Sequence, residues 1–556
     1  PNNHGMADTL RRAGYRTIHV GKNGLAGGEG GTDVTGTGSQ NLGGHPLDRG
    51  FDDFFGYLFH GDGHEHYPQN GTTNKTAHIY DQYQQVKNAS IDLYTTDAWT
   101  AYAKKAIVEE TNDGDGQPFF LYLAYETPHF KMQRPAVAYP AGGGFSGGVQ
   151  WTTETDGAGD TRYASTATGN GTPDAFDHPD NGASWPTAQK QHVGMIRRID
   201  NSVADIIQLL KDLDIDDNTI CVFSSDNGPH NEGNNPRYFE SYANMEGIKR
   251  DMLEAGIRVP TVVRWPGNIA GSTDDENNIK EIAYPSSIWD WMPTFADLAE
   301  VPAPSWCDGV SLVPTLTGSG TQRDKGYLYF EFNTTGTTPS WTQFANHAGD
   351  PKGQMQCIRI DDYMGIRTAI SAPTDNFQIY DAVMDPGQAI DLATSLPDLQ
   401  KRMKELALQS RRPGTVSRPY DSANVPSLSL STEEGLIATS YEGIWTYVPE
   451  FRDLTAASST MVNGFDLSAR SRDQDVGILF EGFVEVPTAG TYSFFVESDS
   501  GANLFVHDAH VIDDDFNHTG SEQSASINLE AGKHPIRLHY RHGVAANHSL
   551  NVSWSG

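Results

Sequence analysis

The sequence is poor in cysteine and in positive charge, and it has no long apolar run. Three cysteines in 556 residues do not make the disulfide scaffold of a small secreted domain. No stretch of about 18 apolar residues is present, so no membrane span is expected. The 39 basic side chains stand against 72 acidic ones, for a formal net charge of −33. This charge argues against nucleic acid or an anionic membrane as a partner, and an anionic ligand would need a local cluster of cations.

The composition predicts a globular protein of several domains. A length of 556 residues suggests roughly two to four domains, and 10 Trp, 24 Phe and 23 Tyr side chains provide large surfaces to bury. The sequence leaves open whether Cys307 and Cys357 pair. No signal peptide begins at Pro1, so we expect either that a leader has been removed or that the natural start lies further upstream.

The run Ser-Ser-Asp-Asn-Gly-Pro-His at 224–230 is the most informative segment, because it directly follows an apolar strand predicted at 219–223. Open α/β folds build their sites at the ends of such strands. Asp226 and Asn227 would place two oxygen ligands there, and oxygen ligands suit calcium or magnesium. The same residue types more often form only a turn. This segment alone does not decide between the two interpretations.

Three other segments carry basic side chains in similar positions. Lys22 follows a strand predicted at 17–20, His129 follows a buried strand predicted at 118–124, and Lys249 lies in a run flanked by glycines. In this order and spacing, the segments resemble the type I sulfatases of the alkaline phosphatase superfamily. The resemblance extends from about residue 9 to about residue 399, so it does not rest on one short motif.

The resemblance implies an α/β fold with an alkaline-phosphatase-like sheet sandwiched by helices. We place this sulfatase-like domain at 1–315 and a small C-terminal α+β subdomain at 316–412. Apolar residues at helical spacing between 193 and 210 predict an amphipathic helix that packs on the sheet. A glycine-rich loop is expected at 24–44. The polar stretch 141–182 is read as a surface insertion, either a plain solvated loop or a substrate contact.

The last quarter of the chain has a different pattern. Residues 413–428 contain several prolines and read as a linker, and alternating strands and turns follow. The segments 490–506 and 529–538 resemble the PA14 domain. This implies an all-β module at 429–556 that either binds glycans or serves as a structural spacer.

The sulfatase resemblance also implies roles for individual residues. Asp226 and Asn227 would bind calcium, in preference to magnesium. Lys22, His129 and Lys249 would be catalytic and would hold the sulfate, with His129 assisting proton transfer. An isolated lysine is usually a solvated surface charge, but within these motifs the functional interpretation is favoured.

Two weaker matches surround these residues. His64, in Gly-His-Glu-His-Tyr-Pro at 63–68, resembles a substrate-side segment of a subgroup of sulfatases and is assigned to substrate binding. A histidine in an ordinary loop is the more common explanation of such a segment. His230, Asn231 and Glu232 also match a subgroup pattern, but no chemistry is assigned to them.

The chain departs from the family pattern at two places. Asn23 and Gly24 follow Lys22, whereas the family places a sulfate-contacting His two positions after this lysine. The family also makes a formylglycine nucleophile from a Cys or Ser that is followed by Pro and Arg two and four positions later. No Cys or Ser here has that pattern. We therefore expect the nucleophile and an Asp pair on a segment ahead of Pro1, and we expect this chain alone to be inactive.

Two hypotheses of function follow from the sequence. The first is a secreted or periplasmic sulfuric ester hydrolase that acts on a sulfated polysaccharide or glycan, with an N-terminal fragment as a possible partner. The second is a catalytically inactive relative that binds glycans or has a structural role. Phosphatases share the implied fold, but the motifs around Lys22 and Lys249 favour a sulfatase. We favour the first hypothesis.

Overall fold

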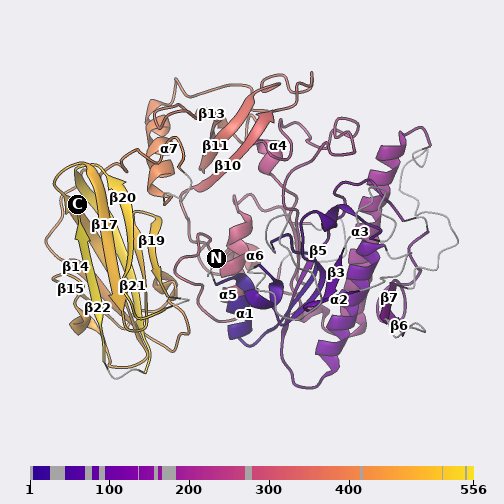
Figure 1. The fold of residues 1–556 in the computed structure, drawn as a ribbon, viewed down its shortest axis with the longest axis horizontal. Helices are drawn as coiled ribbons and strands as arrows, with labels where there is room; N and C mark the ends of the chain where they lie inside the picture. Colours follow the sequence, from indigo (N-terminus) through magenta and orange to yellow (C-terminus); the bar gives the residue numbers. More distant parts are fainter. Residues whose placement is uncertain are drawn as a thin grey trace.

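The computed structural model describes residues 4–25, 44–68, 78–86, 94–135, 137–155, 161–165, 183–269, 279–412, 417–515, 518–544 and 547–556. Figure 1 shows three parts. The first part, in indigo to magenta, combines a sheet with helices, a smaller part with β10–β13 and α7 follows it, and a sandwich of strands forms the C-terminal end. Most of the predicted glycine-rich loop at 24–44 and much of the insertion at 141–182 lie outside the described residues.

The first part is built on a five-stranded sheet of order β4-β3-β2-β1-β5. Strand β1 lies between β2 and β5 and runs parallel to both. The strands are β1 (Arg16–Lys22), β2 (Asp53–Tyr57), β3 (Ile79–Asp81), β4 (Gln84–Gln85) and β5 (Phe119–Ala124).

Helices cover both faces of this sheet, as Figure 1 shows. On one face, Ile18 and Val20 of β1 pack with Trp99 of α2 (Thr95–Asn112), and the long α3 (Thr187–Asp212) lies beside α2. On the other face, Phe120 of β5 contacts Phe295 of α5 (Trp291–Leu298), and α1 (Met6–Arg12) packs against β1. The predicted alkaline-phosphatase-like sandwich is confirmed.

The strand that precedes Asp226 belongs to a separate small sheet. Within the described residues, β8 (Cys221–Phe223) pairs only with β9 (Val262–Arg264), in antiparallel fashion. Cys221 and Leu121 of β5 pack into one apolar cluster, but no strand pairing between β5 and β8 occurs within the described residues. Tyr122, Phe223 and Val262 are 47%, 41% and 60% exposed. Tyr122 of β5, Phe223 of β8 and Val262 of β9 therefore present apolar side chains near an edge that is unpaired within the described residues.

The smaller part is an antiparallel sheet of order β10-β11-β12-β13. One of its faces packs against α7 (Pro397–Gln409) through Met403 and Leu406. Its other face packs against Met252 and Leu253, which lie just before the short helix α4 (Glu254–Ile257). The strands are β10 (Leu328–Thr337), β11 (Pro351–Ile360), β12 (Tyr363–Arg367) and β13 (Gln378–Asp381). The sheet therefore supports the segment that carries Lys249.

Three further elements complete the first two parts. A hairpin of β6 (Trp151–Thr155) and β7 (Thr161–Ser165) forms within the region predicted as an insertion without regular structure. The predicted domain boundary after residue 315 falls inside α6 (Val313–Thr317), and the domain limits stay predictions.

None of the described helices has the length and apolarity needed to cross a membrane. Cys221, Cys307 and Cys357 are all free thiols.

The C-terminal part is entirely β-structure. A six-stranded sheet of order β15-β14-β16-β21-β18-β19 faces a three-stranded sheet of order β20-β17-β22. Ile478, Phe480, Phe494 and Leu538 are fully buried in the core between them. The strands are β14 (Leu436–Glu442), β15 (Ser458–Val462), β16 (Val476–Val486), β17 (Gly490–Ser498), β18 (Gly501–Val506), β19 (Ala509–Asp514), β20 (Gln523–Leu529), β21 (Gly532–His542) and β22 (Leu550–Ser555). The predicted all-β module is confirmed.

This sandwich is docked on the first part by buried hydrogen bonds. Asn503 of β18 donates from Nδ2 to Oγ of Ser305 at 2.8 Å and is fully buried. The Tyr447 hydroxyl donates to the Pro302 carbonyl at 2.6 Å, and the Ser305 amide donates to the carbonyl of Val448 at 2.9 Å. Buried polar groups are costly to leave unpaired, so these bonds oppose separation of the two parts.

We predict that Asn503→Ala and Ser305→Ala are energetically coupled. Each variant removes one partner of a buried bond, and the double variant should therefore be about 0.5–1 kcal/mol more stable than the sum of the single losses predicts. Urea unfolding of the four proteins measures this coupling. Thr491→Ala, which affects an exposed pair with Asn528 inside the sandwich, serves as the control with no coupling to Ser305→Ala. Strictly additive losses for Asn503 and Ser305 would contradict the docked arrangement.

Candidate active site

Lys22 ends β1, His64 lies in the turn after β2, and His129 lies on the loop after β5. Asp226, Asn227 and Lys249 lie on the loop after β8. Because β1 and β5 are parallel neighbours, the residues after them meet at one edge of the sheet. Gly21 has φ +103°, and a Cβ there would lie 2.2 Å from the Ala124 carbonyl oxygen. Only glycine allows this approach, which brings Lys22 close to the loop that carries His129.

Lys249 and His129 form the central contact. Lys249 Nζ lies 2.8 Å from His129 Nε2. His129 Nδ1 lies 2.9 Å from the Phe130 carbonyl oxygen, which can only accept, so Nδ1 donates and Nε2 of the neutral ring accepts from the ammonium. Burial and the charges of Lys249 and Lys22 lower the pKa of His129 to about 4. At neutral pH the site therefore holds a neutral imidazole that orients a charged lysine.

Glu232 closes this pair from the other side. Its Oε2 lies 3.2 Å from Lys249 Nζ and 3.4 Å from His129 Nε2, and its Oε1 accepts from Arg250 at 2.7 Å. Burial alone would raise the pKa of Glu232, but the hydrogen bond from Arg250 and the charge of Lys249 outweigh it and lower the pKa to about 2. No chemistry was assigned to Glu232 from the sequence, because its partners Lys249 and Arg250 lie 17 and 18 residues further along the chain.

Lys22 and His64 lie in the same cluster. The His64 ring stacks on His129 with centroids 4.8 Å apart and an interplanar angle of 9°. A Cβ at Gly63 would lie 2.7 Å from Lys22 Cδ, so the turn that bears His64 covers the aliphatic part of Lys22. Burial lowers the pKa of Lys22, an effect that Glu126 opposes and Lys249 reinforces. Burial and Lys22 lower the pKa of His64 to about 4. All four predicted sulfate-side residues are therefore neighbours.

Two buried carboxylates hold the loops of this cluster. Glu126 is fully enclosed and accepts from Trp99 Nε1 at 2.7 Å, and His66 lies between Glu126 and the carbonyl of His129. On the lysine side, Asp251 accepts from the Ile248 amide at 2.8 Å. The sequence analysis missed both supports. A carboxylate directly after an apolar strand is the signal that would have pointed to Glu126.

Asp251 also ties the lysine loop to the smaller part of the molecule. Its Oδ1 lies 2.8 Å from the ammonium of Lys352 in β11 and accepts from Thr338 at 2.9 Å. The Lys249 amide donates to the Pro229 carbonyl at 2.8 Å, which joins the same loop to the turn after β8. Lys249 is therefore held by bonds from two directions.

Asp226 and Asn227 lie in the turn after β8. The Asn227 amide donates from Nδ2 to the Gly228 carbonyl at 2.8 Å, which leaves its carbonyl oxygen as the ligand atom. Asp226 is exposed and acts electrostatically on Lys22 and His230. Calcium takes about 6–8 oxygen ligands, and the described residues contain no cluster of three metal-binding side chains. The two oxygens fit a hard cation in kind but supply only part of a coordination sphere.

The three thiols are poor nucleophiles in their surroundings. Burial raises the pKa of Cys221 to about 11 and that of Cys307 to about 12. Burial also raises the pKa of Cys357 well above its usual value. Because the thiolate is the reactive form, these environments give no activated cysteine.

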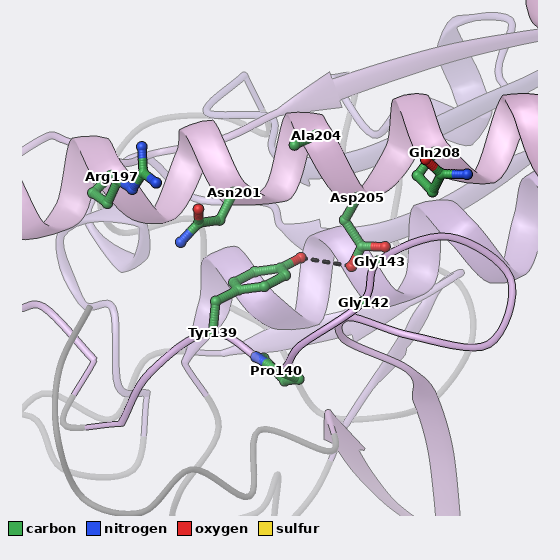
Figure 2. A pocket seen from close by; sticks show the side chains of 9 residues that line it. All are labelled: Tyr139, Pro140, Gly142, Gly143, Arg197, Asn201, Ala204, Asp205 and Gln208. Carbon is green, nitrogen blue, oxygen red and sulfur yellow. Dashed lines mark hydrogen bonds between the residues drawn. The ribbon is translucent and has the colours of Figure 1, made fainter. Parts of the chain in front are cut away.

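A hollow of about 510 Å³ lies beside α3 and shares no lining residue with the charged cluster. Figure 2 shows Tyr139 pointing at Asp205 across it, with a hydroxyl-to-carboxylate bond of 2.8 Å. Asp205 also pairs with the buried Lys104 at 2.6 Å and accepts from the Gly144 and Val149 amides. Asp205 thus anchors the loop that contains Tyr139, Gly144 and Val149 to α3, which is a structural role.

We predict that removing the charge of Lys249 raises the pKa of His129. Lys249 is among the charges that lower this pKa, so Lys249→Met should move the titration upward from about pH 4. Nitrogen-15 NMR of labelled histidine side chains measures the shift. Arg250→Gln removes a charge that faces Glu232 instead and should move His129 less. An unchanged His129 titration in Lys249→Met would contradict the contact.

The chain matches three known families along its length. Residues 1–301 match the family described as Sulfatase, residues 248–412 match the C-terminal region described for N-sulphoglucosamine sulphohydrolase, and residues 452–556 match the PA14 domain. The first match covers more than half of the 556 residues.

Individual relatives align over shorter stretches. The steryl-sulfatase of Homo sapiens is 35% identical over 145 residues, which is 25% of this chain and 23% of that protein. The N-acetylgalactosamine-6-sulfatase of Canis lupus familiaris is 34% identical over 158 residues, which is 27% of each chain. The alignments thus span about a quarter of these relatives' length.

A solved structure supports the fold. The crystal structure of Ps i-CgsB in complex with k-i-k-neocarrahexaose superposes with a TM-score of 0.50 at 20% identity, over 72% of this chain and 73% of that chain. At this identity the similarity concerns the fold alone.

Proposed function

The chain belongs to the sulfatase family, and we propose that it forms the substrate-holding part of an enzyme that hydrolyses sulfate esters. The observation that carries this proposal is the contact of Lys249 with His129 beside Lys22 and His64. In a protein with a formal net charge of −33, this is a local positive site for a small anion. Hydrolysis of a sulfate monoester needs cations around the nonbridging oxygens and a proton for the leaving oxygen.

The described side chains divide these tasks. Lys22 and Lys249 hold the sulfate oxygens, and His64 contacts the substrate from the face of His129. Nε2 of His129 accepts a hydrogen bond from Lys249 and therefore carries no proton of its own. Within this pair, the Lys249 ammonium supplies the proton for the leaving oxygen, and the His129 imidazole orients the ammonium. Glu232 pairs with Lys249 until the sulfate takes its place.

Calcium and a formylglycine complete the proposed site. Asp226 and Asn227 would hold the calcium ion, whose charge would stabilise the sulfate oxygens. We propose that the remaining ligands and the formylglycine come from a segment outside this sequence. The edges of β5 and β8, which are unpaired within the described residues, and their exposed apolar side chains support a place for one more strand. The raised pKa values of the three thiols support a nucleophile from elsewhere.

We propose a sulfated glycan as the substrate and a secreted or periplasmic location. The relatives include an N-acetylgalactosamine-6-sulfatase, and the similar fold of Ps i-CgsB was solved with a carrageenan oligosaccharide. The competing proposal is a noncatalytic glycan-binding protein. Gly24, which stands two positions after Lys22 where the family has a sulfate-contacting His, favours that alternative.

We predict that the complete protein releases sulfate from a generic aryl sulfate or a sulfated glycan, and that Lys249→Ala lowers its kcat/KM by about 100-fold or more. The loss follows from the missing charge at the sulfate. Lys401→Ala, at a lysine exposed on α7, is the matched control and should keep full activity. Residues 1–556 alone should be inactive. Normal turnover by Lys249→Ala would remove the role assigned to this lysine.

We also predict that calcium stabilises the complete protein through Asp226. Millimolar calcium should raise its melting temperature by linkage, magnesium should raise it less, and Asp226→Asn should abolish the calcium effect. Differential scanning calorimetry measures these shifts. Asp473→Asn changes an exposed carboxylate in the sandwich and should leave the calcium effect intact. Equal stabilisation of Asp226→Asn and the natural protein would show that Asp226 is not a ligand.

A further inference from the structure

A row of stacked imidazoles leads away from the charged cluster. His129 stacks on His230 with centroids 5.6 Å apart, and His230 stacks on His192 of α3 at 6.1 Å, both with interplanar angles of 17°. Burial lowers the pKa of His192 to about 4 and also lowers that of His230. Both nitrogens of His230 are engaged within the protein, by the Pro128 carbonyl and the Glu232 amide. The neutral imidazole of His192 carries a donor and an acceptor, which suits a sugar hydroxyl better than an apolar ligand.

Aromatic side chains gather on the segment that continues this row. Phe239 lies 4.9 Å from both Trp185 and Tyr238, measured between ring centroids. Phe239 and Tyr238 are 38% and 41% exposed. We call Trp185, Tyr238 and Phe239 the aromatic patch. Clusters of exposed large aromatics on a soluble protein commonly mark a binding surface.

The aromatic patch is tied to the charged cluster from two sides. His230 and Phe239 lie on one continuous loop, which Asn234 pins to α3 by a 2.9 Å bond to Nδ1 of His192. Trp185 lies two residues before Thr187, the first residue of α3, and His192 lies in the second turn of that helix. The patch therefore lies a short distance beyond His192 and outside the sulfate position.

Polar side chains and one arginine surround the patch. Arg237 precedes Tyr238 in sequence, bonds to Asn235 and lies with its guanidinium 5.1 Å over the ring of Trp341. In a protein with 72 acidic residues, an exposed arginine here is suited to a ligand with negative groups. The combination of flat aromatic faces with a cation and amide groups matches a sugar ring, which has apolar C–H faces and a polar rim.

We propose that the aromatic patch is a second subsite, which binds a sugar ring of a sulfated oligosaccharide whose reacting sulfate lies between Lys22 and Lys249. This inference rests on the proposed function and adds to it that the substrate is an oligosaccharide. A sugar two or more units from the reacting sulfate packs on Phe239 and Trp185, and its hydroxyls bond to His192 and Arg237. The patch thus selects longer chains over single sugars.

Binding of matched short and long ligands tests this subsite. Isothermal titration calorimetry of residues 1–556 in millimolar calcium uses two pairs of ligands. The first pair is N-acetylgalactosamine 6-sulfate and a chondroitin 6-sulfate hexasaccharide. The second pair is a sulfated monosaccharide and a hexasaccharide from κ-carrageenan. We expect at least one hexasaccharide to bind about 10-fold more tightly than its monosaccharide. Phe239→Ala should lose this gain and keep the affinity for the monosaccharide, and Lys249→Ala should weaken both ligands.

Two further variants serve as a substitute and a control in this experiment. Tyr238→Ser tests the patch if Phe239→Ala does not fold, as judged by circular dichroism. Phe332→Ala removes a similarly exposed ring from β10 and should keep the gain. If monosaccharide and hexasaccharide bind equally, or if both patch variants keep the gain, the subsite is overturned and the proposed function stands. If none of the four sugars binds, the proposed function falls and the subsite with it.

Discussion

An ammonium group held against a neutral imidazole is the contact on which the rest of the site depends. The Lys249–His129 bond joins two loops that are 120 residues apart in sequence. It is possible only because the Phe130 carbonyl fixes the proton of His129 on Nδ1 and because Glu232 balances the charge of Lys249. Several cations in one pocket repel each other, so a cluster of this kind needs nearby carboxylates and firm anchoring.

That anchoring explains the division of the molecule into parts. Asp251 links the loop that carries Lys249 to β11 through its ion pair with Lys352. Apolar packing of Met252 and Leu253 on the same sheet strengthens this link. Lys249 lies in the overlap of the two family matches, at 248–301. The antiparallel sheet is therefore a support for the reacting groups, although it carries none of the predicted site residues.

Much of this arrangement was predictable from the sequence, because strands that end in polar residues indicate a site at the edge of a sheet. The strands before Lys22 and His129 form as predicted, and the four sulfate-side residues meet. Glu232 and Asp251 were not predictable, since their roles depend on side chains from distant parts of the sequence, whereas the place of Glu126 after an apolar strand was a usable signal. The β6–β7 hairpin was missed because its short polar strands show no apolar alternation.

The open edge between β5 and β8 has a consequence for the physical behaviour of the chain. An edge strand with free backbone groups and exposed apolar side chains such as Tyr122 and Phe223 is a template on which a strand of any other chain can add. Self-association of the chain at this edge would pair those backbone groups and cover those side chains. Colloidal repulsion from the strongly acidic surface is the property that opposes such aggregation and keeps the molecules apart.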